Sequence, residues 1–124
     1  MSKKFDTIVV PCKDSKRDNN KMLDNGYWAG VKIAESRKNK LKYIAIYHTA
    51  PTSEITEWYR IKFPIDSWNE QDSSKCKIFF DKASCEKLNI KYNGDKSSIM
   101  RASRYTQHDR CKNAKNLKEL FYFS

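Results

Sequence analysis

Short runs of β-branched and aromatic residues carry the hydrophobic pattern of this chain, and such runs predict strands. Residues 41–48 (LKYIAIYH) alternate most clearly, because odd-numbered side chains fall on one face of a strand and even-numbered side chains on the other. Three further strands are predicted at residues 7–11 (TIVVP), 27–33 (YWAGVKI) and 75–80 (KCKIFF).

Residues 57–63 (EWYRIKF) alternate as well, and the alternation assigns a face to each side chain. The apolar face carries Tyr59, Ile61 and Phe63, and we expect it to be buried. Trp58 lies on the other face, in phase with two basic residues. We therefore expect Trp58 to be exposed.

Polar segments separate these strands and predict connections. They are residues 13–25, with one helical turn at 21–23, residues 36–40, residues 64–74, residues 82–88, which fit a loop or short helix, a turn at 93–95, and an irregular basic segment at 101–106. Apolar residues recur at helical spacing over residues 110–121 and predict a C-terminal helix. We expect a single α+β domain over residues 1–124: a small, partly open β-barrel of five or six strands with short helices at its edges.

The net positive charge of the chain indicates that the domain binds an anionic partner. The 124 residues include 25 Lys and Arg against 15 Asp and Glu, a formal net charge of +10. Residues 1–50 and 75–124 carry the excess of basic side chains, and residues 51–74 are acidic. A basic surface that only serves solubility is the alternative. No apolar run approaches the roughly 20 residues of a membrane-spanning helix, and no signal-type segment follows the polar start of the chain, so we expect a cytoplasmic protein with no membrane partner.

Four short motifs follow one another between residues 26 and 66. They are WAGVK at 28–32, AIYHT at 45–49, an Ala-Pro break at 50–51, and residues 55–61 leading into PID at 64–66. Their order resembles the EVE branch of the PUA-like superfamily, although Lys32 stands where that family usually has arginine. The resemblance implies a pseudo-barrel that binds nucleic acid, in some relatives by holding a modified base in an aromatic pocket, in RNA modification or in restriction and related defence systems.

Aromatic side chains and a histidine supply candidates for such a base pocket, since an unpaired base is held by stacking and by hydrogen bonds to its edge. The candidates are Trp28, Trp58, Tyr27, Tyr47 and His48. Trp28, beside a predicted loop, and Trp58, in phase with basic residues, are the expected walls. Core packing is the alternative role for each ring, and fastening of a strand end is the alternative role for His48.

Phosphate-binding candidates come from the two basic flanks of the chain. They are Lys32, Arg37 and Lys38 in the first flank, and Arg101, Arg104 and Lys112 in the last. Arginine forks match phosphate oxygens, so Arg101 and Arg104 form the better-shaped pair. The expected partner is DNA or RNA, with or without a modified base, and each neutralised phosphate should make affinity fall with salt.

The sequence contains none of the common catalytic signatures, so we expect a protein that is not an enzyme and has no cofactor. Eight residues separate Cys76 from Cys85, whereas zinc-ligand pairs are about two to four residues apart, so no metal site is predicted. Two alternatives stay open: a protein-interaction or inhibitor domain that docks through its acidic segment, and a small nucleic-acid-processing enzyme. A partner nuclease or NTPase encoded elsewhere is compatible with the first reading.

Overall fold

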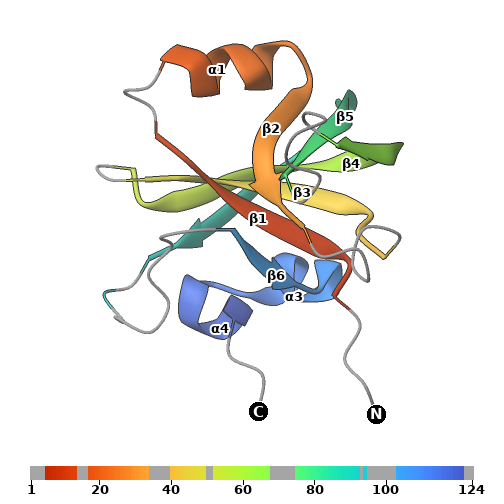
Figure 1. Ribbon diagram of the computed structural model, residues 1–124. Helices are drawn as coiled ribbons and strands as arrows, with labels where there is room; N and C mark the ends of the chain where they lie inside the picture. Colours follow the sequence, from red (N-terminus) through yellow and green to blue (C-terminus); the bar gives the residue numbers. More distant parts are fainter. Residues whose placement is uncertain are drawn as a thin grey trace.

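The protein folds as one curled, open sheet of six strands with short helices on both of its faces (Figure 1). The computed structural model describes residues 5–13, 17–33, 40–49, 52–67, 75–92, 94 and 103–121. The strands are β1 (Thr7–Cys12), β2 (Tyr27–Lys32), β3 (Tyr43–His48), β4 (Glu54–Ser67), β5 (Lys75–Lys91) and β6 (Arg104–Thr106). The helices are α1 (Arg17–Asp24), α3 (His108–Asn113) and α4 (Leu117–Phe121). The predicted architecture, a small and partly open barrel of five or six strands with short helices, is confirmed.

The strands follow the order β2-β5-β4-β3-β1-β6, so β2 and β6 are the two edges of the sheet. β1 runs parallel to β3, and the other neighbouring pairs are antiparallel. β6 is short and pairs with β1 only over Thr7–Val9. Because the sheet curls, its two edge strands approach each other across an open seam (Figure 1).

The sheet buries a core on each face. The inner core fills the curl and draws on five strands, with Ile8, Trp28, Ile44, Tyr59 and Phe80 among its members. Helix α1 closes one side of it through Met22 and Leu23, which are partly buried against this cluster. The polar sequence of residues 13–25 predicted a loop with a single helical turn, and this prediction is wrong for residues 17–24, which form α1.

The outer core lies between the opposite face of the sheet and the helices α3 and α4. Val9, Ala45, Tyr47, Ile55, Trp58 and Ile90 come from the strands, and Cys111, Leu117, Leu120 and Phe121 come from the helices. The predicted helical spacing of the apolar residues is confirmed, since these helix residues are buried. The single helix predicted over residues 110–121 is wrong, because Ala114 is extended and separates α3 from α4.

Strand β3 shows why two cores form on one sheet. Ile44 and Ile46 enter the inner core, and Ala45 and Tyr47 enter the outer core. The alternation predicted for residues 41–48 is confirmed, with both faces of the strand covered.

Strands β4 and β5 are longer than the sequence pattern predicts. β4 runs on through Pro64 to Ser67, and β5 continues through residues 82–88, which were predicted as a loop or short helix. The polar residues there form an irregular exposed part of β5, where the register against β4 shifts. The Arg60 amide donates to Ser84 Oγ at 2.7 Å, and Ser84 Oγ donates to the Asp81 carbonyl at 2.6 Å. Pairing with β4 therefore makes a strand of a segment with little apolar periodicity.

The structure also describes parts of the basic segment at 101–106 and of the turn predicted at 93–95. The segment at 101–106, predicted as irregular, forms strand β6 over its last three residues. Gly94 lies in a bend with a φ of +90°, which fits the predicted turn. Within the described ranges, no helix has the length and hydropathy needed to cross a bilayer.

Candidate nucleic-acid interface

The seam between the two edge strands holds a cavity of about 560 Å³. β2 contributes residues 28–32, β6 and the residue before it contribute Tyr105 and Ser103, β1 contributes Pro11, and α1 contributes Met22. The Tyr105 hydroxyl donates to the Lys32 carbonyl at 3.5 Å and so links the two edges. We call this space the seam cavity.

Trp28 forms one wall of the seam cavity. The side chain belongs to the inner core and is 7% exposed, so only a small part of the indole remains uncovered. The Ala29 amide, on the side of β2 that lacks a strand neighbour, donates to Met22 Sδ at 3.4 Å. An aromatic ring, a thioether and main-chain groups of an edge strand therefore converge on one space.

Gly30 shapes the rim of this cavity. The register between β2 and β5 shifts between Ala29 and Val31, which marks a bulge at Gly30. The φ of Gly30 is +82°, a conformation that glycine adopts without strain. After the bulge, Val31 is buried again and Lys32 is exposed at the cavity.

Trp58 does not share the seam cavity with Trp28, and its predicted exposure is wrong. It lies on the outer face, as the alternation predicted, but α3 covers that face and leaves Trp58 5% exposed. Its ring is edge-on to Tyr43 and to His108, with centroids 5.1 and 4.4 Å apart. The sequence pattern assigned the face correctly and could not show the helix that covers it.

The environment of Trp58 contains two buried polar atoms without a hydrogen-bond partner among the described residues: Trp58 Nε1 and His108 Nδ1. His108 stacks on Tyr43 with ring centroids 3.8 Å apart. Burial lowers the pKa of His108 below its usual value, and Lys112 adds to that effect. This environment therefore favours the neutral imidazole over the imidazolium.

Tyr47 and His48 also lie away from the seam cavity. Tyr47 is 5% exposed within the outer core, and desolvation there raises its pKa. His48 ends β3, with its Nε2 3.7 Å from Glu57 Oε1. Glu57 in turn lies 3.8 Å from Lys87 Nζ and accepts a long hydrogen bond from Cys85 Sγ. This arrangement agrees with the alternative that His48 fastens the strand end to its neighbour.

Tyr27 points to the outer face, because neighbouring residues of a strand point to opposite faces. It is half-buried, and its ring centroid lies 6.2 Å from that of Phe79 on β5. Lys77 Nζ lies 4.4 Å from the Tyr27 centroid and 5.0 Å from the Phe79 centroid. Sequence reasoning missed Phe79, although KCKIFF places Lys75, Lys77 and Phe79 in phase.

The three phosphate-binding candidates within the described residues lie at different places. Lys32 lies at the seam cavity, and Lys112 is exposed on α3, on the helix-covered side of the sheet. The Arg104 guanidinium packs over the Phe121 ring at 4.0 Å, and burial lowers its pKa. Arg37, Lys38 and Arg101 lie outside the described residues.

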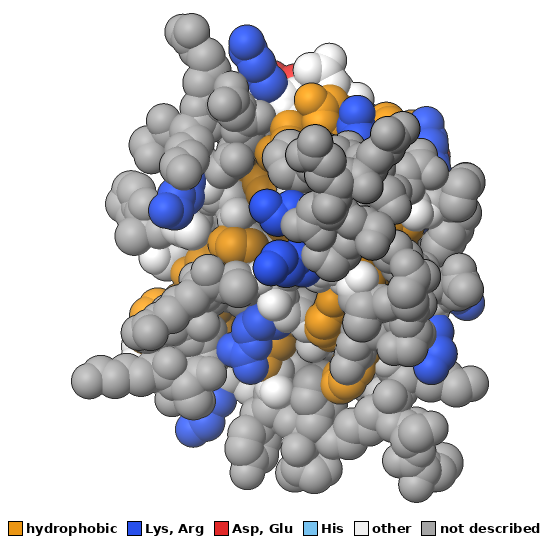
Figure 2. All heavy atoms as spheres, viewed as in Figure 1, with side chains coloured by type: hydrophobic (Ala, Val, Ile, Leu, Met, Phe, Trp, Pro, Cys, Tyr) orange, Lys and Arg blue, Asp and Glu red, His pale blue; other side chains and the backbone are white. Residues whose placement is uncertain are grey.

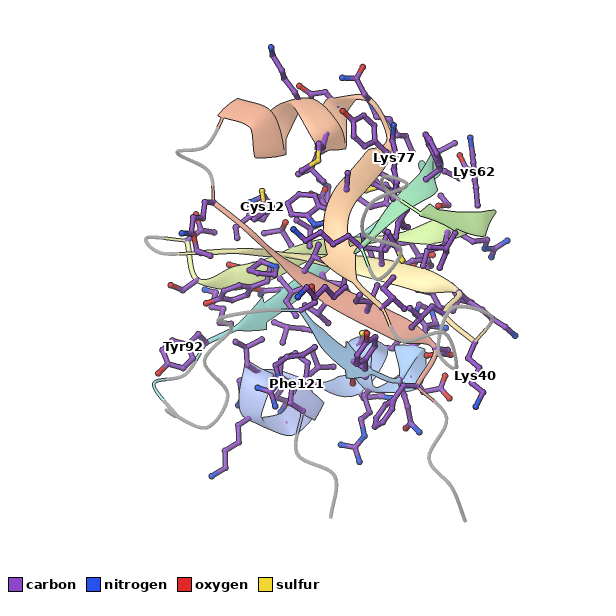
Figure 3. All side chains as sticks on the ribbon, in the orientation of Figure 1. Cys12, Lys40, Lys62, Lys77, Tyr92 and Phe121 are labelled. Atoms are coloured by element: carbon purple, nitrogen blue, oxygen red, sulfur yellow. The ribbon has the colours of Figure 1, made fainter. Side chains whose placement is uncertain are left out.

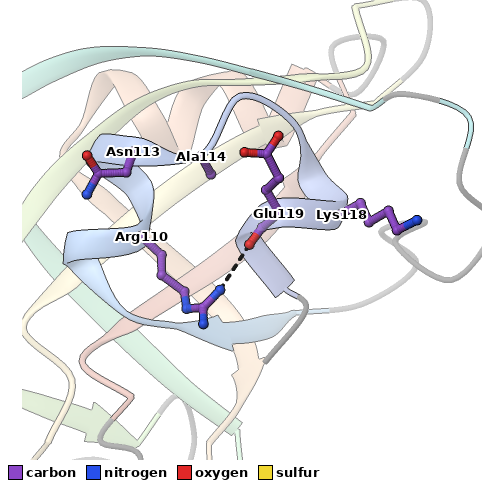
Figure 4. A pocket seen from close by; sticks show the side chains of 5 residues that line it. All are labelled: Arg110, Asn113, Ala114, Lys118 and Glu119. Atoms are coloured by element: carbon purple, nitrogen blue, oxygen red, sulfur yellow. Dashed lines mark hydrogen bonds between the residues drawn. The ribbon is translucent and has the colours of Figure 1, made fainter. Parts of the chain in front are cut away.

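A second hollow, of about 420 Å³, opens between α3 and α4 (Figure 4). Its lining residues are Arg110, Asn113, Ala114, Lys118 and Glu119. The Arg110 guanidinium donates to the Glu119 carbonyl at 3.1 Å across the hollow. None of these lining residues is aromatic, so the hollow lacks the ring that Trp28 and Tyr105 give the seam cavity.

The part of the chain that the structure describes contains no group of three His, Cys, Asp or Glu side chains placed to hold a metal ion. Cys12, Cys76, Cys85 and Cys111 are thiols that form no disulfide. No family model matches the chain, and no curated protein sequence matches it. The resemblance to EVE domains therefore stays a prediction carried by the motifs between residues 26 and 66.

Proposed function

We propose that the protein is a nucleic-acid-binding module of the PUA-like type that reads a single unpaired or flipped base in the seam cavity. The observation that carries this proposal is the convergence of Trp28, Tyr105 and Lys32 on one cavity. The cavity volume lies within the range of about 300–1,000 Å³ that is typical of ligand sites. The segment 28–32, on which the EVE resemblance begins, lines it.

Each part of the cavity has a role in holding a base. Trp28 is 7% exposed, so it offers a base only a small part of its ring and contributes less than the ~1–3 kcal/mol of a base stacked on a fully open aromatic face. The Tyr105 hydroxyl and the main chain of β2 bring hydrogen-bonding groups to the cavity, and a base would bind there in exchange for their present bonds to the Lys32 carbonyl and Met22 Sδ. Lys32 supplies a cation for the adjoining phosphate, and the net charge of +10 supplies a general attraction.

Trp58, Tyr47 and His48 are not part of this proposed reader, because they are held in the outer core or at the far end of β3. We propose a reader without catalytic activity of its own. The partner is DNA or RNA, with or without a modified base.

The test is fluorescence anisotropy with labelled single-stranded DNA and RNA, each with a plain base or a methylated base at one position. Lys32→Ala should weaken binding and reduce the dependence of log affinity on log salt by about one phosphate contact. Tyr105→Phe, which removes only a hydroxyl, should reduce any preference between plain and methylated base. Trp28→Leu should weaken binding by no more than about fivefold, because only a small part of the ring is uncovered.

Lys118→Ala is the matched control, because Lys118 is exposed on α4 and carries the same charge. Since Trp28 is part of the inner core, its variant is interpreted only with Tyr105→Phe and Lys32→Ala, which keep the core intact. Absence of binding at low salt would refute the proposal. Equal affinities for Lys32→Ala, Tyr105→Phe and the control would refute the placement of the site at the seam.

A further inference from the structure

The outer face of the sheet is only partly covered by the described helices. α3 and α4 pack over the part that contains the outer core. The neighbouring part, over β2, the first half of β5 and the second half of β4, carries Phe79, which is 37% exposed. Within the described residues Phe79 is the exposed large hydrophobic side chain, and it has a half-buried aromatic neighbour, Tyr27.

The two rings lie side by side because their strands pair in register. Tyr27 on β2 is opposite Phe79 on β5, and Phe79 is opposite Lys62 on β4. The rings are tilted by 51°, with Lys77 Nζ within 5.0 Å of both centroids. Lys62 and Lys77 lie at the same end of the sheet, away from Phe121 of α4 (Figure 3).

Basic residues outnumber acidic residues on the strands around this ring pair. Lys75 and Lys77 share the outer face of β5 with Phe79, and Lys32 on β2 is opposite Lys75. Arg60 and Lys62 lie on the same face of β4, where Arg60 is opposite Asp81. On the face drawn in Figure 2, the coloured charged side chains are likewise mostly Lys and Arg.

The geometry points to a binding surface for single-stranded nucleic acid on this outer face, formed by Tyr27, Lys32, Arg60, Lys62, Lys75, Lys77 and Phe79. We call it the outer platform. Bases stack on the two rings and the lysines pair with the phosphates between them. The centres of protein–protein interfaces are depleted in lysine. Here Lys77 lies against both rings at the centre of the surface. A polyanion therefore fits this surface better than a protein partner does.

The same chemistry selects a single strand over a duplex. A base inside a duplex is stacked on both faces by its neighbours, so it has no free face for Tyr27 or Phe79. A flexible strand can turn its bases onto the rings while its backbone follows the lysines. We therefore assign the platform to unpaired nucleotides.

The platform adjoins the seam cavity through β2. Trp28 faces the cavity, Tyr27 faces the platform, and Lys32 lies at the cavity and opposite Lys75 of the platform. A strand that places one base in the cavity can lay its following nucleotides over β2 onto the rings. This path rests on the proposed function, but stacking on the platform does not.

The experiment compares anisotropy titrations of a labelled oligouridine, its deoxy form, and a duplex of the same length. Phe79→Leu keeps an apolar side chain but removes the ring, and should weaken binding of the single strand by about 5- to 150-fold. Phe79→Tyr restores a stacking ring and should bind within about twofold of the wild type. Binding of the duplex should be the same in all three proteins.

Charge is tested by Lys77→Gln against Lys118→Gln, which removes the same charge from exposed α4. Only the first should weaken single-strand binding beyond the general effect of charge. Wild-type affinity in Phe79→Leu, equal loss in Phe79→Tyr, or equal affinity for duplex and single strand would each overturn the platform.

Failure of the two proposals can be told apart. Loss in Phe79→Leu and Lys77→Gln, with an unchanged base preference in Tyr105→Phe, would support the platform and refute the seam reader, whereas Lys32 is shared by the two sites and does not separate them. The reverse pattern would support the reader and refute the platform.

Discussion

Trp58 provides the sharpest test of the difference between a base-binding wall and a core residue. Replacing Trp58 with alanine is expected to lower the free energy of unfolding by about 3–5 kcal/mol, as for other buried aromatic side chains. The indole is 5% exposed and contacts Tyr43 and His108, so its removal leaves a cavity between the sheet and α3. Against a total stability of about 5–15 kcal/mol for a domain, this loss is large.

Trp58→Phe separates the apolar contribution of the ring from that of its N–H group. The phenyl ring loses part of the buried area, which destabilises the fold. The substitution also removes the buried indole N–H, which has no partner within the described residues. Burying such a group without a partner costs about 1–3 kcal/mol, so its removal stabilises the fold. The two effects oppose each other, so we expect Trp58→Phe to be within about 1 kcal/mol of the wild type.

Urea unfolding followed by far-UV circular dichroism measures both variants without relying on the tryptophan signal that they alter. Oligonucleotide anisotropy on Trp58→Phe should give wild-type affinity. A stability change below about 1 kcal/mol for Trp58→Ala would refute its role in the outer core. A loss of oligonucleotide affinity in a fully folded Trp58→Phe would restore Trp58 as a base-binding residue.

Two further predictions concern buried titratable groups. The pKa of His108 is lower in the folded protein than in the unfolded chain. As pH falls through about 6.5, the unfolded chain therefore takes up a proton before the folded protein does. The free energy of unfolding should decline below that pH by at most about 1.4 kcal/mol per pH unit. Urea titrations at neutral and mildly acidic pH should show this decline reduced in His108→Phe, and an unchanged pH slope would contradict it. Burial raises the pKa of Cys111 to about 12, whereas Cys85 is only half-buried, so iodoacetamide should modify Cys85 first in the native protein. Mass spectrometry of the modified peptides would contradict this order if Cys111 reacted first.

Three strands could be predicted from local sequence alone, β2 and β3 from their alternation and β1 from its continuous β-branched run. β1, β2 and β3 are found where the pattern placed them. The second half of β5 could not be predicted in this way, because its strand conformation depends on pairing with β4 around Ser84. The interruption between α3 and α4 could have been predicted from Asn116, a residue that often begins a helix, but the helical spacing of the apolar residues favoured one continuous helix. Asn116 accepts the Glu119 amide at 2.9 Å and donates to its carboxylate, which is a capping arrangement at a new helix start.

The candidate site could be predicted only in part, because a strand pattern gives the face of a side chain and not what covers that face. Trp28 and Lys32 were identified and lie at one cavity, whereas Trp58 was placed on the right face and is covered by α3. Tyr105 contributes to the cavity through the curl of the sheet, which brings β6 toward β2. No spacing in the sequence joins residues so far apart along the chain.

The short pairing of β6 with β1 has a consequence for self-association. β1 is apolar on both faces, and such strands readily pair with copies of themselves when an edge is open. β6 blocks that edge along Thr7–Val9, and beyond it Pro11 has no N–H to offer another strand. These three residues of β6 thus cover the edge of β1, and their detachment would expose the main-chain groups of an apolar strand, the feature through which edge strands pair between chains.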